Sequence, residues 1–102
     1  MSDTSSLPES DASTDGYVRI VCVLNEQGLH ARPAARLAQE AQKFTADISI
    51  IQGGQQVDAK SILDILTLAA RHGANLELRA KGDDAREALD CLAEMFKKRF
   101  QQ

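Results

Sequence analysis

Two hydrophobic periodicities alternate along this chain, and they constrain its fold more than any other feature. Runs that are β-branched or alternate between apolar and polar residues, as strands do, occupy residues 17–24, 47–51, 55–58 and 75–81. Apolar residues at helical spacing occupy three further segments, residues 31–43, 61–70 and 85–96. The resulting order, βαββαβα, predicts an α+β domain in which one four-stranded sheet carries its three helices on one face.

The start of the chain differs in composition from the rest. Residues 1–16 hold four acidic residues, no basic residue and almost nothing apolar, so we expect a disordered tail before a single domain at residues 17–102. The remaining 12 basic and 11 acidic residues nearly balance, and the chain has only four aromatic residues. This composition argues against nucleic-acid binding, which favours a basic surface with aromatic side chains.

Signals for membranes, cofactors and metals are missing from the sequence. No run of about 18 apolar residues and no signal-peptide pattern occurs, so we expect no membrane contact and a cytoplasmic protein. Cys22 and Cys91 form no CxxC pair and are expected to be reduced core residues. Paired catalytic carboxylates, metal-ligand spacing and a nucleotide-binding glycine loop are absent, so the sequence predicts no metal site and no cofactor.

The stretch GLHARPAA, residues 28–35, places a histidine directly before a predicted helix. The first N–H groups of a helix have no partner within it and the helix dipole is positive there, so the position favours an anion. Pro33 is tolerated in a first turn, and Arg32 adds a planar, permanently charged phosphate binder. A nucleophilic imidazole in this setting suits a phosphoryl group that is taken up, held on nitrogen and passed on. The alternative is that His30 is only an exposed residue near a cap.

GLHARPAA, followed about 30 residues later by AKSI, resembles the histidine-containing phosphocarrier (HPr) family of the bacterial sugar phosphotransferase system. The resemblance extends from Tyr17 to about Phe100. The family fold, an open-faced β-sandwich with a four-stranded antiparallel sheet, agrees with the predicted element order. The resemblance implies that His30 is phosphorylated at Nδ1, with the backbone N–H groups of Ala31 and Arg32 and the Arg32 side chain around the phosphate.

Ser61 begins the second predicted helix and fits a capping box, in which Asp64 would accept a bond from the Ser61 N–H. The resemblance implies a second role, because in some bacteria a serine kinase phosphorylates this serine as a regulatory mark. The sequence LDILTL that follows departs from the forms with that regulation, which commonly have a glycine and methionines here. Asp64 would also oppose the negative charge of a phosphate.

The same helix carries more apolar residues than one buried stripe requires. With Ile65 and Leu68 facing the sheet, part of its apolar surface is expected to face solvent, unless the whole short helix is buried. The residues expected to point outward are Ile62, Leu63 and Leu66. The resemblance implies that these residues, with Ala35, contact partner enzymes near His30.

Two groups of basic residues are expected at helix C-termini. His72 follows Arg71 at the end of the second predicted helix, and Lys97, Lys98 and Arg99 form the last turn of the third. A positive charge complements the negative end of a helix dipole, so we interpret these residues as structural.

The residues and the resemblance together predict a monomeric phosphocarrier rather than an enzyme. It would accept a phosphoryl group on His30 from enzyme I, which is charged by phosphoenolpyruvate, and pass it to a downstream sugar-specific component. An alternative within the same family is a regulator of the nitrogen-branch type, whose phosphorylation state controls binding to regulatory partners. A third interpretation is a domain that binds anions without signalling.

Overall fold

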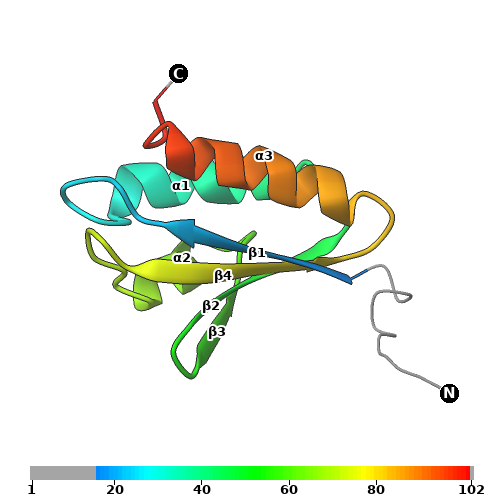
Figure 1. Cartoon of the computed structure of the whole chain (residues 1–102), viewed down its shortest axis with the longest axis horizontal. Helices are drawn as coiled ribbons and strands as arrows, with labels where there is room; N and C mark the ends of the chain where they lie inside the picture. The colour runs from blue at the N-terminus through cyan, green and yellow to red at the C-terminus, as the bar shows by residue number, and fades with distance from the viewer. Residues whose placement is uncertain (1–15, 102) are drawn as a thin grey trace, which may run out of the picture.

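The computed structural model describes residues 16–101 and contains the elements in the predicted order (Figure 1). They are β1 (Gly16–Cys22), α1 (Ala31–Ala41), β2 (Asp47–Gln52), β3 (Gln55–Asp58), α2 (Ile62–Thr67), β4 (Asn75–Lys81) and α3 (Ala85–Lys97). The predicted α+β class and βαββαβα order are therefore confirmed. Residues 1–15 of the expected tail lie outside the described residues, and Gly16 already belongs to β1.

The four strands form one antiparallel sheet in the order β1-β4-β2-β3. Alternation along β4 separates its two faces, because Leu76, Leu78 and Ala80 are buried and the residues between them are not. Val18 and Ile20 of β1 pair with those intervening residues and are 56% and 64% exposed. The helices therefore cover one face of the sheet and leave the other open, which confirms the open-faced sandwich.

The core combines small residues on the helices with branched residues on the strands. The buried residues of α1 recur at helical spacing and are Pro33, Ala34, Leu37, Ala38 and Ala41. Because three of these are alanines, α1 can lie close to α2 and α3. Leu37 is fully buried, and removing such a side chain from water contributes about 2 kcal/mol.

Two predicted elements end two residues early. β1 stops at Cys22 rather than at residue 24, because Val23 exchanges hydrogen bonds with the turn before β4 and leaves the ladder. α1 stops at Ala41 rather than at residue 43, because the N–H groups of Lys43 and Phe44 donate to carbonyls three residues back and tighten the last turn. In both places the apolar pattern continues into the turn, so hydrophobicity alone does not mark the boundary.

α2 is shorter than the predicted helix at residues 61–70. Ser61 is its N-cap rather than a helical residue, and the helix ends at Thr67. Beyond it, Ala69 has a φ of +48°, a left-handed backbone that usually belongs to glycine at the end of a helix. This residue stops the helix and turns the chain toward β4.

The turn between α1 and β2 is tied to the start of α3 by Asp84. Its Oδ2 atom accepts the N–H of Thr45 at 2.9 Å, and its Oδ1 atom accepts the N–H of Ala46 at 2.8 Å. These backbone donors, Thr45 first, hold the pKa of Asp84 below its ordinary value of 3.8. Asp84 is also the N-cap residue of α3, yet its side chain makes no capping bond to that helix.

Both cysteines are free thiols. The prediction that they are core residues is wrong, because both are only partly buried. Cys22 lies on the open side of the sheet and is partly exposed, because it shares the alternation of Ile20. Cys91 of α3 donates a hydrogen bond to Oε2 of Glu40 at 3.2 Å. Burial first, and then the neighbouring carboxylate, raise the pKa of Cys91 to about 11. A thiol with this pKa is a poor nucleophile at neutral pH.

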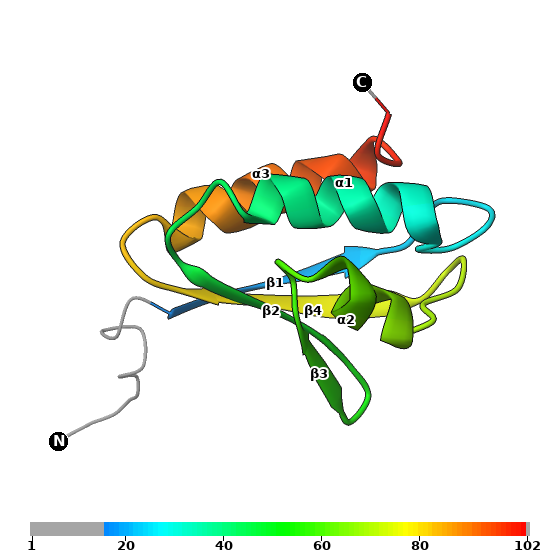
Figure 2. The same cartoon turned by 180° about the vertical axis from the view of Figure 1, so that it is seen from behind.

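α1 and α3 lie side by side over the covered face of the sheet and run in opposite directions (Figures 1 and 2). The start of α1 is therefore next to the end of α3. A hydrogen bond of 2.9 Å from Nδ2 of Asn25 to the carbonyl oxygen of Arg99 joins the loop before α1 to the residues after α3. This edge of the molecule brings together two segments that are far apart in the sequence.

Candidate functional site

His30 is the N-cap residue of α1 and begins a helix that no side chain caps. Its backbone is extended, with φ −80° and ψ −168°, and its exposed side chain makes no capping hydrogen bond. The first helical bond runs from the Ala34 N–H to the His30 carbonyl, at 3.0 Å. The N–H groups of Ala31 and Arg32, in the first turn, have no partner among residues 16–101. Pro33, the third residue of the helix, has no N–H. Two donors and the positive end of an 11-residue helix thus adjoin the imidazole.

The loop before α1 is held in place by the segment that follows α2. Gly28 has a φ of +73°, and a Cβ atom there would lie 2.4 Å from the carbonyl oxygen of Ala70. The same oxygen accepts the N–H of Leu29 at 2.9 Å, and the Leu29 side chain is buried. Glycine is therefore required at residue 28 both for its left-handed backbone and for this close approach. His30 follows an anchored residue, so its backbone is fixed although its ring is exposed.

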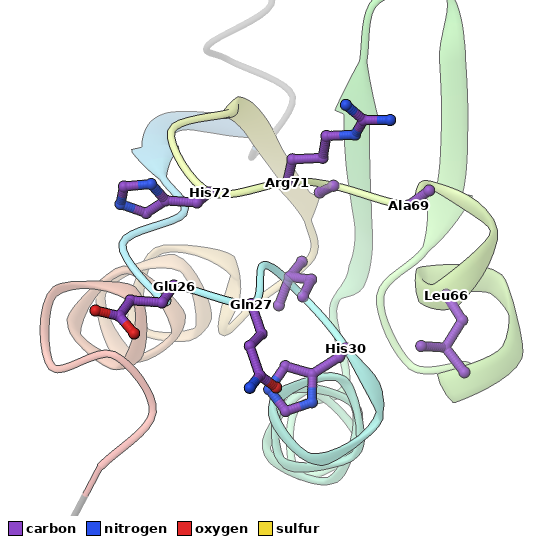
Figure 3. Close-up of a pocket in the computed structure, with 9 residues that line it drawn as sticks. Glu26, Gln27, His30, Leu66, Ala69, Arg71 and His72 are labelled. Atoms are coloured by element: carbon purple, nitrogen blue, oxygen red, sulfur yellow. The ribbon is translucent and has the colours of Figure 1, made fainter.

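His30 lines two neighbouring surface cavities, and the first extends toward α2. This cavity has a volume of about 500 Å³ and includes the chain between α2 and β4. Figure 3 shows His30 at the start of α1, with Leu66 of α2 to one side and Glu26 and His72 from two loops to the other. The imidazole thus shares a cavity with part of the apolar surface of α2.

The second cavity, of about 660 Å³, extends from His30 toward the end of α3 and is basic. Arg32 and Arg36, one turn apart on α1, line it together with Arg99. Ala35, which lies between the first two in sequence, is half-buried and does not line this cavity. Within the described part of the chain, none of these three guanidinium groups has a carboxylate at salt-bridge distance. Three positive charges without a neutralising partner favour a multiply charged anion beside His30.

Ser61 caps α2, as the capping box predicts, but the second half of that box is wrong. The Oγ atom of Ser61 accepts the N–H of Asp64 at 3.2 Å. The Ser61 N–H donates to the carbonyl oxygen of Asp58 at 3.1 Å, and Oδ2 of Asp64 instead accepts the N–H of Asp58 at 3.3 Å. The Asp64 carboxylate therefore joins α2 to the end of β3, and Ser61 lines neither of the cavities that contain His30.

Part of the apolar surface of α2 faces solvent, in agreement with its surplus of apolar residues. Leu63 is 75% exposed and Ile62 is 37% exposed, whereas Ile65 and Leu68 are buried. Leu66 is only half-buried, because it packs against the core with one side and lines the first cavity with the other. The expectation that Leu66 points outward is therefore met only in part.

Neither Arg36 nor Arg99 is assigned from the sequence to the site around His30, although both line its second cavity. The predicted place of His72 at the end of a helix is wrong. His72 lies in the exposed turn before β4 and lines the first cavity, because α2 ends well before it. Arg99 lies beyond α3, which ends at Lys97, and not in its last turn. Arg36 could be found from its position four residues after Arg32, which places both on one helix face. No comparable sequence signal points to the other two residues.

No group of three potential metal-ligating side chains occurs between residues 16 and 101. None of the helices in that range is both long and apolar enough to cross a bilayer.

Comparison with known proteins identifies the family. The family model described as "PTS HPr component phosphorylation site" matches residues 18–98. The chain belongs to the HPr family. Phosphocarrier protein HPr of Cupriavidus necator is 40% identical over 82 residues, which is 80% of this chain and 92% of that protein. The HPr family comprises phosphocarrier proteins of the phosphotransferase system, which carry a group rather than act as enzymes.

Two further relatives define the fold and its variety. Phosphocarrier protein NPr of Shewanella violacea is 39% identical over 84 residues, 82% of this chain and 92% of that protein. The crystal structure of HPr from Thermoanaerobacter tengcongensis superimposes with a TM-score of 0.81 at 36% identity, covering 84% of this chain and 97% of that chain. The open-faced sandwich is therefore the HPr-family fold. The range matched by the family model includes His30 and Ser61 and ends just before Arg99.

Proposed function

We propose that this HPr-family chain accepts a phosphoryl group on Nδ1 of His30 from phosphorylated enzyme I and passes it to a downstream sugar-specific component. The uncapped N-terminus of α1 carries the proposal, because an exposed imidazole, two unpartnered N–H groups and three arginines occur there together. In the transfer, the phosphorus–nitrogen bond to the donor histidine breaks as a phosphorus–nitrogen bond to His30 forms. The chain needs no cofactor for this exchange.

The residues around His30 have distinct roles in this scheme. The N–H groups of Ala31 and Arg32 donate hydrogen bonds to phosphoryl oxygens, and the Arg32 guanidinium binds the same group with its two-pronged geometry. These donors stabilise the charge on the phosphoryl oxygens while the group moves between nitrogens. Gly28 acts indirectly, by fixing the loop that presents the imidazole.

Partner enzymes dock on the apolar surface formed by Ile62, Leu63 and Leu66 of α2, together with Ala35 of α1. The exposure of Leu63 and the place of Leu66 in the cavity that contains His30 support this assignment. A partner seated on this surface covers the imidazole and excludes water, which protects the transferring group from hydrolysis. In this scheme the chain acts as a cytoplasmic monomer.

Labelling tests the proposal directly. The chain is incubated with enzyme I and radiolabelled phosphoenolpyruvate, and the labelled protein is then exposed to acid or base. We expect label that is lost in acid and retained in base, as a phosphoramidate behaves and a serine ester does not. A label that survives acid, or no transfer from active enzyme I, contradicts the proposal.

A regulatory role of the nitrogen-branch type is the second candidate. The observation in its favour is that NPr of Shewanella violacea is nearly as similar to this chain as HPr of Cupriavidus necator, at 39% and 40% identity. Sugar uptake in a strain that lacks the gene separates the two. Loss of uptake supports the sugar carrier, whereas normal uptake combined with phosphorylation-dependent binding to a regulator supports the second candidate.

A further inference from the structure

The turn that ends α3 has non-glycine residues at left-handed backbone positions. The N–H of Arg99 donates to the carbonyl of Phe96 at 3.1 Å, and the N–H of Phe100 donates to the carbonyl of Met95 at 2.8 Å. These two bonds form a Schellman motif, which ordinarily has glycine at its left-handed position. Here Arg99 occupies that position with a φ of +55°, and Phe100 follows with a φ of +61°. A left-handed backbone is strained for both residue types.

Two contacts hold this strained turn in place. The Phe100 side chain is 6% exposed and packs edge-on against Phe96, with ring centroids 4.9 Å apart. The carbonyl oxygen of Arg99 accepts the hydrogen bond from Nδ2 of Asn25. Phe100 therefore anchors the turn in the core, and Asn25 joins it to the loop that leads to His30.

The turn places Arg99 at the basic cavity beside His30. α3 runs antiparallel to α1, so its end lies next to the start of α1 (Figures 1 and 2). Arg99 lines the cavity of about 660 Å³ together with His30, Arg32 and Arg36. A feature of the sequence that looks like a basic helix end is thus part of the wall of the candidate site.

The charges around Arg99 distinguish it from its neighbour. Lys98 lies 3.9 Å from a carboxylate oxygen of Glu94, one turn earlier on the same helix, and does not line the cavity. Arg99 has no carboxylate partner among the described residues. A strained backbone in the wall of this cavity, together with a guanidinium that has no carboxylate partner among the described residues, points to a functional contact of the Arg99 side chain.

We propose that Arg99 supplies a second guanidinium, after Arg32, to the phosphoryl group carried by His30. This inference rests on the proposed function and adds to it a residue from outside the family match. The left-handed turn sets the backbone from which the Arg99 side chain extends at the cavity, and the phosphoryl dianion is the ligand that its guanidinium contacts. Bidentate pairing of this kind is stronger than a contact with a single point charge.

Inorganic phosphate and phosphoramidate serve as probes, since neither needs a partner enzyme. Phosphate affinity is measured from the amide NMR shifts of Ala31 and Arg32. Phosphoramidate transfers its phosphoryl group to His30 as its own phosphorus–nitrogen bond breaks and ammonia leaves, and the initial rate of this labelling is the second readout. Thermal unfolding is the third.

The variants separate a phosphate contact from a structural role. We expect Arg99→Gly to weaken phosphate binding and slow labelling about fivefold while raising the melting temperature, because glycine relieves the left-handed strain. Arg99→Gln should weaken binding to the same extent without that gain in stability. Arg99→Lys should lie between wild type and Arg99→Gln. The matched control, Lys98→Gln, should change both readouts less than about twofold, because an exposed charge outside the cavity is screened.

The outcomes also separate this inference from the proposed function. Wild-type affinity and labelling in Arg99→Gly and Arg99→Gln overturn the role of Arg99, even if enzyme I labels the wild type normally. An equal loss in Lys98→Gln also overturns it, because the effect is then one of net charge. Arg99-dependent phosphate binding in a chain that enzyme I fails to label supports the contact and contradicts the carrier function.

Discussion

The N-termini of α1 and α2 treat the same unpartnered backbone N–H groups in opposite ways. At α2, Ser61 accepts the N–H of Asp64, and Asp64 places a negative charge in the first turn. At α1, no side chain caps the helix and no acid occurs in the first turn. Capping ordinarily stabilises a helix by about 1 kcal/mol. Under the proposed function, the open end of α1 is available to a phosphoryl group, whereas the closed end of α2 serves stability.

Removal of the imidazole at the open end of α1 should abolish phosphorylation. His30→Ala should abolish labelling by enzyme I and phosphoenolpyruvate completely, because it removes the nucleophile from the open helix end. Ser61→Ala and His72→Ala should keep the label, since neither residue stands at that end. Scintillation counting of the purified proteins measures this. Persistent label on His30→Ala would assign the acceptor to another residue.

A smaller effect is expected at Arg32. Arg32→Lys keeps the positive charge but loses the two-pronged geometry, so transfer from enzyme I should slow about tenfold. The melting temperature should hardly change, because the Arg32 side chain is exposed and has no salt bridge among the described residues. Rapid-quench kinetics and a thermal scan provide the two readouts. An unchanged rate would remove Arg32 from the site.

Stability should show the opposite pattern from labelling. Ser61→Ala should lower the free energy of unfolding by about 1 kcal/mol, because it removes the accepted bond from Asp64. His30→Ala should change the free energy of unfolding by less than about 0.5 kcal/mol, because its side chain makes no capping bond. Denaturant unfolding of the two variants tests this contrast, and equal losses would show that α1 does depend on His30 as a cap.

A phosphate on Ser61 would add negative charge to the capped N-terminus of α2. It brings about two negative charges close to the Asp64 carboxylate, which already complements the dipole there. We expect the phosphate to stabilise the domain less in the wild type than in an Asp64→Ala background. Unfolding curves with and without the phosphate are compared within each background, since Asp64→Ala also removes the bond to Asp58. Equal stabilisation in both would restore Ser61 as a regulatory site.

At the third helix N-terminus, that of α3, only a small change in stability is expected. Its N-cap Asp84 accepts hydrogen bonds from Thr45 and Ala46 instead of capping the helix, and they hold its pKa below 3.8. Because the pKa of Asp84 is lower in the folded than in the unfolded state, its carboxylate stabilises the fold at pH values above the unfolded-state pKa. This contribution is lost as the pH falls through the folded-state pKa. Asp84→Asn should therefore melt below the wild type at pH 7, and the gap should narrow below about pH 3.8. A gap that is independent of pH would contradict the prediction.

The parts of the molecule that could be predicted from sequence depend on local patterns. The element order follows from periodicity, and the place of His30 follows from a histidine and a proline at the start of a helix. The partner of Asp64 could not be predicted, because Asp58 comes near it only through the packing of β3 beside α2. Arg99 could not be predicted either, because its place depends on a left-handed turn without glycine and on antiparallel packing of two helices.

The contact between Gly28 and Ala70 has a consequence for how this protein can vary or be engineered. A side chain at residue 28 has no room, since even its first carbon would lie 2.4 Å from the Ala70 carbonyl oxygen. The turn between α2 and β4 looks like a safe place to insert a peptide, because its residues at 71–73 are exposed. An insertion there that displaced Ala70 would also displace the loop before α1. A graft that displaced Ala70 would thus shift His30 from its position without touching it.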